Sequence, residues 1–230
     1  MRVAALYDVH GNVHALEAVL AEIDVERIVF GGDLASGPFP RETIELAQSL
    51  PNAVFVRGNA DELATPAMDE AAEKGRRWVE GQLSQEQLRW LAALPFQATF
   101  DDTLYVHANP IDVLEVVTQW TPDQELERYR PHIETSQIVT GHVHMQWRRE
   151  LDGVSWICAG SVGMPYEQEP GAYWALVEDG QADFHRTDYD VDRAADAVRR
   201  SGHPLAHELA EENVRRVPSQ DEVRAFFAQL

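Results

Sequence analysis

Short hydrophobic runs alternate with longer amphipathic segments over the first part of the chain. Each run is almost entirely apolar, which is typical of a strand buried on both faces of a sheet. The runs predict three strands, at residues 2–7, 27–30 and 53–56. Helices are expected between them, one capped by Asn12 and one over Pro40 to Leu50. Alternating strands and helices indicate an α/β fold with a largely parallel sheet.

In the middle of the chain, we expect helices first and β-strands after them. Residues 62–95 keep a helical pattern with a capping box, and Trp78 and Trp90 are interpreted as packing residues there. Strands are then expected at residues 97–100, 103–106, 113–118, 137–140, 146–151, 154–158, 172–177 and 182–187. A helix from Pro122 to Tyr129 follows the third of these strands, and Glu178-Asp179-Gly180 forms the turn between the last two.

The last segment, residues 190–230, has a helical pattern and no strand signal. Neither an internal repeat nor a flexible linker interrupts the chain. Its 230 residues are enough for one large hydrophobic core. We therefore expect a single domain over residues 1–230, with a helical segment at about 62–95 near the functional site and a C-terminal helical appendage.

The charge balance is strongly acidic. The chain has 19 Lys and Arg residues against 39 Asp and Glu residues, a formal net charge of −20. A surface of this sign repels a phosphate backbone, so we expect no extended nucleic-acid partner. The arginine doublets in predicted helices are expected to pair with acidic neighbours or with helix C-termini. An anionic substrate would then need another source of attraction, which bound divalent metal would supply.

Cysteine content and hydropathy indicate an intracellular protein. Cys158 is the single cysteine, which excludes an internal disulfide framework, and its hydrophobic neighbours predict a buried thiol. No apolar run reaches the length of a membrane span, and the run before Asp8 is too short for a signal peptide. We therefore expect a cytoplasmic protein without a membrane partner.

Polar residues stand at the carboxyl end of one predicted strand after another. In Gly141-His142-Val143-His144, two imidazoles at i and i+2 of an extended chain lie on the same side. Ligands bind at this end of the strands in parallel α/β sheets. Oxygen and imidazole donors without thiolate favour Mn²⁺, Fe or Zn²⁺ at a hydrolytic centre, and seven donors suit two metals that share one carboxylate. The seven candidate ligands are Asp8, His10, Asp33, Asn59, His107, His142 and His144.

Each of these segments alone has an ordinary structural interpretation, because Gly-Gly-Asp and Gly-Asn are also turn sequences. Their order along the chain is more specific. They resemble the five sequence blocks of the calcineurin-like metallophosphoesterases, here at residues 8–12, 31–33, 58–61, 106–108 and 141–144. The similarity continues over residues 159–165, which resemble the loop and strand after the second histidine pair in small bacterial members.

The resemblance implies a four-layer α-β-β-α sandwich with a dinuclear metal centre. It implies one metal held by Asp8, His10, Asp33 and His144. It implies a second metal held by Asp33, Asn59, His107 and His142, with Asp33 as the bridging ligand. Catalytic roles are expected for Asp33, Asn59 and His107. Mn²⁺ is the favoured ion, and Fe, Zn²⁺, Ni²⁺ and Mg²⁺ are the alternatives.

Two positions depart from the family pattern. Ala60 stands where many members have a histidine credited with protonating the leaving group, and Ala108 replaces a common glycine with little expected effect. Small bacterial relatives without that histidine are often phosphodiesterases, so the resemblance implies a preference for diesters. Asp61 is a weak candidate for the missing acid and is interpreted instead as capping the next helix.

The expected activity is hydrolysis of small phosphodiesters by in-line attack of a metal-bridging hydroxide, with leaving groups of low pKa favoured. A phosphomonoesterase or protein phosphatase of the same family is one alternative. A non-catalytic metal-binding scaffold is another, because a eukaryotic trafficking subunit of this fold also lacks the histidine that Ala60 replaces. The complete ligand set favours the enzyme, with a small-molecule phosphate ester as its partner.

Substrate specificity is expected to lie in residues 62–95, in Asn109-Pro110 and in the loop from Ser161 to Pro170. Asn109 and Tyr166 are the candidate substrate-binding residues. Neither the physiological substrate nor the oligomeric state follows from the sequence. The histidines that lack a position at a strand end are interpreted as surface or packing residues: His14, His132, His185, His203 and His207.

Overall fold

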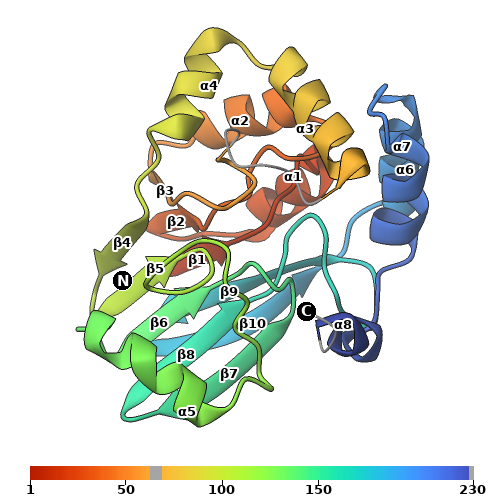
Figure 1. Cartoon of the computed structure of the whole chain (residues 1–230). Coiled ribbons are helices and arrows are strands. Elements are labelled where there is room, and N and C mark those ends of the chain that lie inside the picture. Colours follow the sequence, from red (N-terminus) through yellow and green to blue (C-terminus); the bar gives the residue numbers. More distant parts are fainter. Residues whose placement is uncertain (63–68, 228–230) are drawn as a thin grey trace.

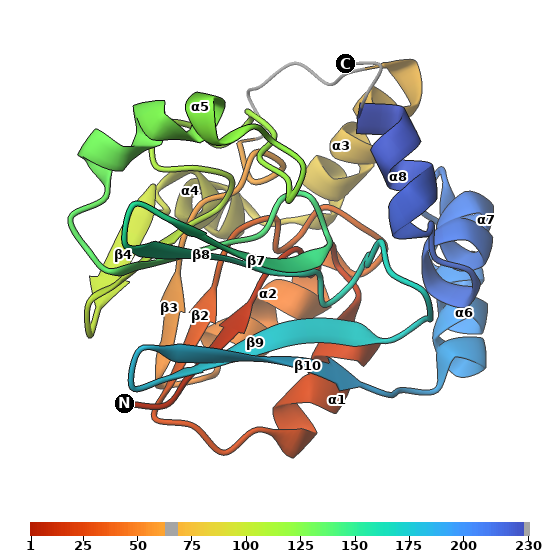
Figure 2. The same ribbon diagram turned by 90° about the horizontal axis from the view of Figure 1, so that it is seen from below.

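Two five-stranded mixed sheets lie face to face in a computed structural model, which describes residues 1–62 and 69–227 (Figure 1). Helices cover the outer side of each sheet. Seen from below, α5 (Asp123–Leu126) lies outside one sheet and α1 (Val13–Glu22) lies outside the other (Figure 2). The molecule is therefore an α/β, four-layer α-β-β-α sandwich with C-terminal helices, as the resemblance implied.

The first sheet has the strand order β10-β9-β1-β2-β3. Its strands are β1 (Val3–Leu6), β2 (Arg27–Phe30), β3 (Ala53–Phe55), β9 (Ala172–Glu178) and β10 (Gln181–Thr187). β1, β2 and β3 are parallel, whereas β9 runs antiparallel to β1 and pairs with β10 in a hairpin across the predicted turn. The helices α1 and α2 (Pro40–Gln48) connect the parallel strands, and Asn12 caps α1 as predicted.

The second sheet has the strand order β4-β5-β6-β8-β7. Its strands are β4 (Gln97–Phe100), β5 (Thr103–Val106), β6 (Gln137–Thr140), β7 (Gln146–Leu151) and β8 (Val154–Ala159). β5, β6 and β8 are parallel, and β4 and β7 are antiparallel edge strands. The helix predicted at Pro122 is α5, which continues as the 3-10 helix η1 (Glu127–His132).

Three hydrophobic layers follow from this arrangement. Neighbouring residues of a strand point to opposite faces, and here both faces are covered. In β1, Leu6 packs under the outer helices, whereas Ala5 faces the other sheet. The strands can therefore be apolar on both faces, which explains the continuous hydrophobic runs of the sequence. Tyr7 follows β1, and its hydroxyl donates to the Val139 carbonyl of β6 at 2.8 Å, which joins the two sheets.

The helical segment predicted at residues 62–95 forms α3 (Glu70–Gln82) and α4 (Gln85–Ala92), and residues 63–68 of the predicted segment lie outside the described residues. The predicted capping box is present at the start of α4. Both helices pack against the outer face of the first sheet and extend its hydrophobic core.

The C-terminal segment is helical, as predicted, up to the last described residue. Its elements are α6 (Val191–Arg200), α7 (Ala206–Glu208), the π-helix η2 (Leu209–Arg215) and α8 (Gln220–Phe227), and residues 228–230 of the predicted appendage lie outside the described part. Arg199 pairs with Glu211 at 2.6 Å and Arg215 with Asp192 at 3.0 Å, as expected for the arginine doublets. Within the described ranges, no helix is both long and apolar enough to cross a membrane.

The predicted packing residues are found in the core or against it. The Trp90 ring packs edge-on against Phe55, with ring centroids 4.9 Å apart. Trp78 contacts His203 in the same way, at 4.8 Å, and this contact joins α3 to the C-terminal helices. Cys158 is fully buried in β8, and burial raises the pKa of its thiol to about 12. Such a thiol is a small hydrophobic side chain with little reactivity at neutral pH.

The strand predicted at residues 113–118 is wrong, because this stretch forms turns between β5 and α5. Its valines have the composition of a strand, but the polar residues before them decide the conformation. The Asp112 carboxylate accepts the backbone N–H groups of Leu114 and Glu115 at 2.8 and 2.7 Å. Such side-chain hydrogen bonds replace the ladder of a sheet and stabilise turns. Val117 is nevertheless buried, which accounts for its hydrophobic character.

We expect His203 to reduce stability in acid. Burial lowers the pKa of His203 to about 4, and its Nδ1 accepts the Leu205 N–H at 3.1 Å. Because the folded-state pKa lies below the unfolded value near 6.5, stability is lost as the pH falls from about 6.5 toward 4. His203→Phe keeps a ring beside Trp78, and urea unfolding of this variant should show a shallower loss over that range. Equal slopes for the variant and the native protein would contradict this expectation.

Candidate metal centre

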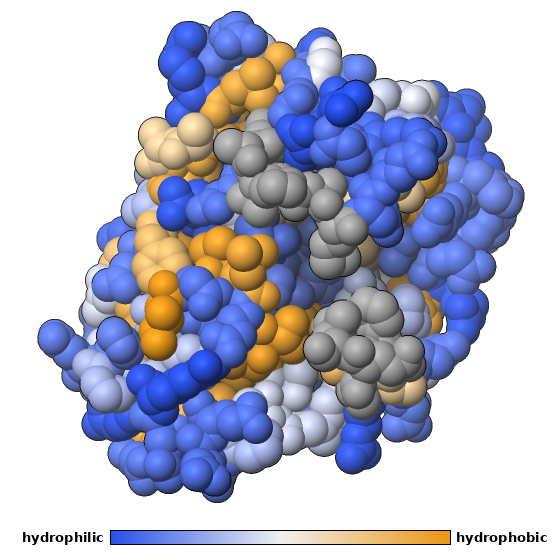
Figure 3. Space-filling model, in the orientation of Figure 1, coloured by the Kyte–Doolittle hydropathy of each residue, from blue (hydrophilic) through white to orange (hydrophobic). Residues whose placement is uncertain are grey.

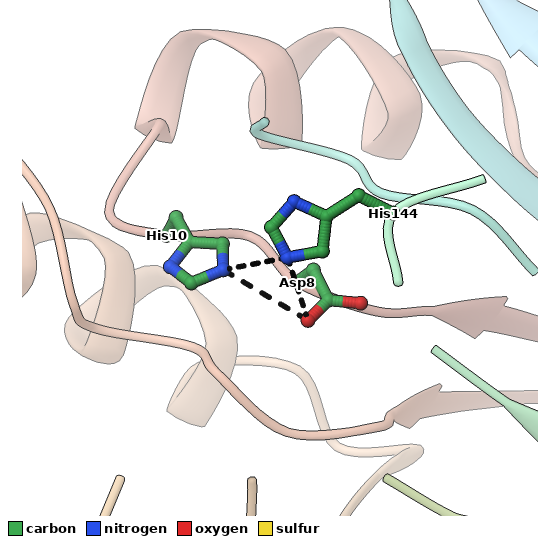
Figure 4. Close-up of side chains that lie close together, drawn as sticks. All are labelled: Asp8, His10 and His144. Atoms are coloured by element: carbon green, nitrogen blue, oxygen red, sulfur yellow. Dashed lines mark hydrogen bonds and ion pairs between the residues drawn. The ribbon is translucent and has the colours of Figure 1, made fainter. Parts of the chain in front are cut away.

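Asp8 and two histidines form the first of two donor groups at the carboxyl ends of the strands (Figure 4). The His144 Nε2 lies 3.4 Å from Asp8 Oδ1 and 3.1 Å from His10 Nε2. The His10 Nε2 lies 3.8 Å from the same carboxylate oxygen. Asp8 and His10 follow β1 of the first sheet, whereas His144 follows β6 of the second. Two sheets therefore supply donors to one point.

His107 is the centre of the second donor group. Its Nε2 lies 2.9 Å from the Asn59 Oδ1, 3.2 Å from the His142 Nδ1 and 3.5 Å from the Asp33 Oδ2. These residues come from the ends of β2, β3, β5 and β6. Asp8 also lies close, with its Oδ1 at 4.0 Å from the His107 Nε2.

Asp33 lies between the two groups. Its Oδ2 is 3.5 Å from the His107 Nε2 of the second group and 3.7 Å from the His10 Nε2 of the first. Its other oxygen, Oδ1, accepts the Ala60 N–H at 2.7 Å. One carboxylate oxygen is thus held by the backbone, and the other faces imidazoles of both groups, which is the placement that a bridging ligand requires.

Each of the four imidazoles has one ring nitrogen against a backbone carbonyl. A carbonyl only accepts hydrogen bonds, so the nitrogen facing it must carry the proton, and in a neutral ring the other nitrogen has a free lone pair. In all four rings this second nitrogen faces the donor groups, as in metal sites whose outer hydrogen bonds fix the tautomer. The pairs are His10 Nδ1 with Ser36 O, His107 Nδ1 with Gly31 O, His144 Nδ1 with Met164 O and His142 Nε2 with Leu114 O, at 3.1, 2.9, 2.6 and 3.0 Å. The second nitrogen of His107 also faces the Asn59 Oδ1 at 2.9 Å.

One carboxylate oxygen at the centre lacks a hydrogen bond. Asp8 is fully buried, and its Oδ2 accepts the His142 N–H at 2.8 Å, but its Oδ1 has no hydrogen-bond partner among the described residues. Buried polar atoms are almost always paired, because an unpaired one loses its hydration without compensation. The orphaned oxygen lies beside ring nitrogens of both groups, and a cation there would pair it. The donor set therefore fits a divalent metal site.

Electrostatics set the protonation states of these donors. Burial lowers the pKa of His142 to about 4 and also lowers that of His10. Burial raises the pKa of Asp8, but the surrounding imidazoles outweigh it and hold that pKa below its usual value. Burial lowers the pKa of His107, and the charges of Asp33 and Asp8 raise it above its ordinary value. At neutral pH, His10 and His142 are neutral beside an ionised Asp8, as ligation requires.

Five of the seven candidate metal ligands have a left-handed backbone conformation. The φ angles are 52°, 46°, 53°, 68° and 58° for Asp8, His10, Asp33, His142 and His144. Residues other than glycine rarely adopt this region, and it costs about 1–3 kcal/mol for each. Such strain persists only where the surrounding structure enforces it, and it gathers at functional sites. The left-handed conformations were not predicted from the sequence.

Two glycines of the motifs are required by close approach rather than by their own conformation. A Cβ on Gly58 would lie 2.1 Å from Asp33 Oδ1, and a Cβ on Gly141 would lie 2.4 Å from Asp8 Oδ2. Both distances are far inside van der Waals contact. The carboxylates are thus packed directly onto the backbone of the neighbouring block, which explains why glycine precedes Asn59 and His142.

Asp61 positions the centre, a role that the sequence did not predict. The interpretation of Asp61 as a helix cap is wrong, because its Oδ2 accepts the N–H groups of Asp33 and Gly58 at 2.8 and 2.9 Å and its Oδ1 accepts the Leu34 N–H at 3.1 Å. Burial, followed by the charge of Asp33, raises the pKa of Asp61 to about 7. The signal in the sequence was its place two residues after Asn59, inside a motif.

The two candidate substrate-binding residues are placed differently. Asn109 is fully buried, and its Oδ1 accepts the backbone N–H groups of Ile111 and Asp112 at 2.8 and 2.9 Å, so its side chain shapes the loop after β5. The Tyr166 ring stacks on the His144 ring, with centroids 4.7 Å apart, and burial raises the pKa of its hydroxyl to about 12. Direct contact of either residue with substrate stays a prediction.

The fold and the donor groups define the class of protein: an α-β-β-α sandwich with a candidate metal centre at the strand ends. Comparison of the sequence with protein families specifies it further. A model described as the calcineurin-like phosphoesterase superfamily domain matches residues 1–180. The chain belongs to this superfamily.

Individual relatives cover nearly the whole chain. It is similar to the crystal structure of a metallophosphoesterase from Sphaerobacter thermophilus, with 28% identity and a TM-score of 0.78, over 91% of this chain and 99% of that one. The hypothetical protein PH1004 from Pyrococcus horikoshii OT3 shares the fold, with 20% identity, a TM-score of 0.82 and coverage of 94% and 99%. An uncharacterized protein of Methanocaldococcus jannaschii, MJ0912, is 25% identical over 226 residues, 85% of this chain and 91% of that protein.

We expect Asp61→Asn to destabilise the metal-free protein by about 1.5–3 kcal/mol, because an amide cannot accept all three buried N–H groups. The free energy of unfolding in urea measures this loss. Asp102→Asn is the matched control, since Asp102 is exposed and accepts the Ser136 N–H from outside the centre at 3.1 Å. Equal effects of the two substitutions would show that Asp61 does not hold the loops of the centre.

Proposed function

We propose that the protein is a dinuclear-metal-dependent phosphoesterase that hydrolyses small phosphodiesters. The observation that carries this proposal is the orphaned Asp8 Oδ1, which lies among imidazole nitrogens that face inward. A site of this kind, in a chain of the phosphoesterase superfamily, is best explained by cations that these donors share. We assign one ion to Asp8, His10, Asp33 and His144, and the other to Asp33, Asn59, His107 and His142.

Two bound divalent cations would supply charge stabilisation to the phosphoryl oxygens and activate a water molecule for attack. Other groups of the chain orient the proposed metal ligands. The backbone carbonyls keep each imidazole in one tautomer, and Asp61 fixes the loop that carries Asp33. Oxygen and nitrogen donors without thiolate favour Mn²⁺. Fe, Zn²⁺, Ni²⁺ and Mg²⁺ are alternatives, and the ion that is bound depends on which ions are available.

Ala60 supports a preference for diesters with good leaving groups. Its side chain is a methyl group, and its N–H is already bound to Asp33 Oδ1, so position 60 offers no proton to a departing alkoxide. A leaving group of low pKa departs without an acid. A diester also carries one negative charge where a monoester carries two, and so places less charge among acidic residues.

Asp33→Asn should abolish tight binding of both ions, because the bridging role needs a negative oxygen between the two donor groups. Calorimetric titration of the metal-free variant with Mn²⁺ would measure the number of ions bound. Asp24→Asn, an exposed substitution, is the control and should leave the stoichiometry at two. Two ions bound with native affinity to Asp33→Asn would exclude the bridging assignment.

The decisive test compares hydrolysis of bis-p-nitrophenyl phosphate and p-nitrophenyl phosphate by metal-free protein titrated with Mn²⁺. We expect metal-dependent turnover with a higher kcat/KM for the diester, and a loss of at least about a hundredfold in His107→Ala. His132→Ala removes an exposed histidine and should retain full activity. A preference for the monoester would favour the phosphomonoesterase, and ion binding without turnover of either ester would favour a scaffold.

A further inference from the structure

Two large hydrophobic side chains are exposed on the loop that contacts His142 of the candidate metal centre. Ile111 is 47% exposed and Leu114 is 55% exposed, and both lie in the loop that follows His107. Among the described residues, Phe184 at 38% is the third large hydrophobic side chain with such exposure, and it lies on β10. The space-filling view shows hydrophobic atoms gathered on this face of the molecule (Figure 3). The loop therefore presents apolar surface where a polar one would be expected.

Hydrogen bonds within the loop fix these two side chains in their exposed positions. Asn109 and Asp112 accept four backbone N–H groups of the loop, and the Asn109 Nδ2 donates to the Glu115 carbonyl at 3.1 Å. Glu115 also pairs with Arg128. Several polar groups of the loop are thus engaged with one another, and Ile111 and Leu114 add exposed apolar surface to it.

The loop is also tied directly to the centre. The Leu114 carbonyl accepts a hydrogen bond from the His142 Nε2 at 3.0 Å, so Leu114 directly contacts a proposed metal ligand. Asn109 comes two residues after His107, and Val113 and Val117 anchor the loop in the core beneath. The backbone of the loop cannot move far from the centre without breaking these contacts.

We propose that Ile111 and Leu114 form an apolar lip that binds the organic group of the substrate, and that this group is aryl or branched alkyl rather than a sugar. The inference rests on the proposed phosphoesterase function, because the phosphoryl group must be held at the metal centre for its substituent to reach the lip. Burial of apolar surface drives this contact. A sugar would lose water from its hydroxyls against these two side chains, which offer no hydrogen-bonding group in return.

Binding of two phosphonates to the Mn²⁺-loaded protein tests the lip without any need for turnover. Their P–C bond is not an ester bond, and methylphosphonate and phenylphosphonate differ only in the organic group. We expect the native protein to bind phenylphosphonate roughly tenfold more tightly in calorimetry, as for hydrophobic pockets that gain a comparable contact. The ratio should fall close to one in the double variant Ile111→Ser/Leu114→Ser. Phe184→Ser, which removes an exposed hydrophobic side chain on β10, should keep the native ratio.

A preference for phenylphosphonate that persists in the double variant would contradict the proposed apolar lip. Equal affinities of the native protein for the two phosphonates would contradict it as well. Hydrolysis of methyl p-nitrophenyl and phenyl p-nitrophenyl phosphate separates this result from the proposed function. Turnover of both esters together with equal phosphonate affinities would contradict the apolar lip alone. Selective binding of phenylphosphonate without turnover of either ester would support the lip and contradict the catalytic proposal. No binding of either phosphonate overturns the lip together with the phosphoryl site.

Discussion

Two carboxylates that cannot be hydrated determine much of this structure. Asp8 and Asp33 are buried, and removing an ionised carboxylate from water costs several kcal/mol unless it is paired. The backbone pairs one oxygen of each, through the N–H groups of His142 and Ala60. The remaining oxygens face the imidazoles of His10, His107 and His144. The fold thus completes half of the electrostatic pairing, and the proposed cations would complete the other half.

This pairing also explains why the two sheets meet as they do. Asp8 ends a strand of the first sheet, and its backbone carbonyl accepts the Ser161 hydroxyl at 2.7 Å, from the loop that follows β8 of the second sheet. The Tyr7 hydroxyl joins the sheets one residue earlier. Small shifts between the sheets would separate donors that now lie 3–4 Å apart. The hydrophobic layer between the sheets and the polar contacts at their edge therefore depend on each other.

The sequence predicted the strands and the polar residues at their ends because both follow from simple periodicity, whereas the four layers were implied by the resemblance to the metallophosphoesterases. A strand buried on both faces must be apolar throughout, and polar residues at its carboxyl end must lie with those of its parallel neighbours. It did not predict the left-handed backbone or the role of Asp61, because both depend on contacts between loops that are distant in the chain. The strand expected at 113–118 was wrong because local turn hydrogen bonds from Asp112 outweighed the β-propensity of the valines.

The left-handed backbone of the donor residues has a consequence for the proposed binding of ions. Strands and hydrogen bonds enforce these conformations, so the main chain sets the positions of the donors. Under the proposed function, binding would resemble ligand exchange at a rigid chelator, in which an ion sheds water into an ordered set of donors. The ion pool around the protein would then decide which metal is bound, because the same donors accept several ions.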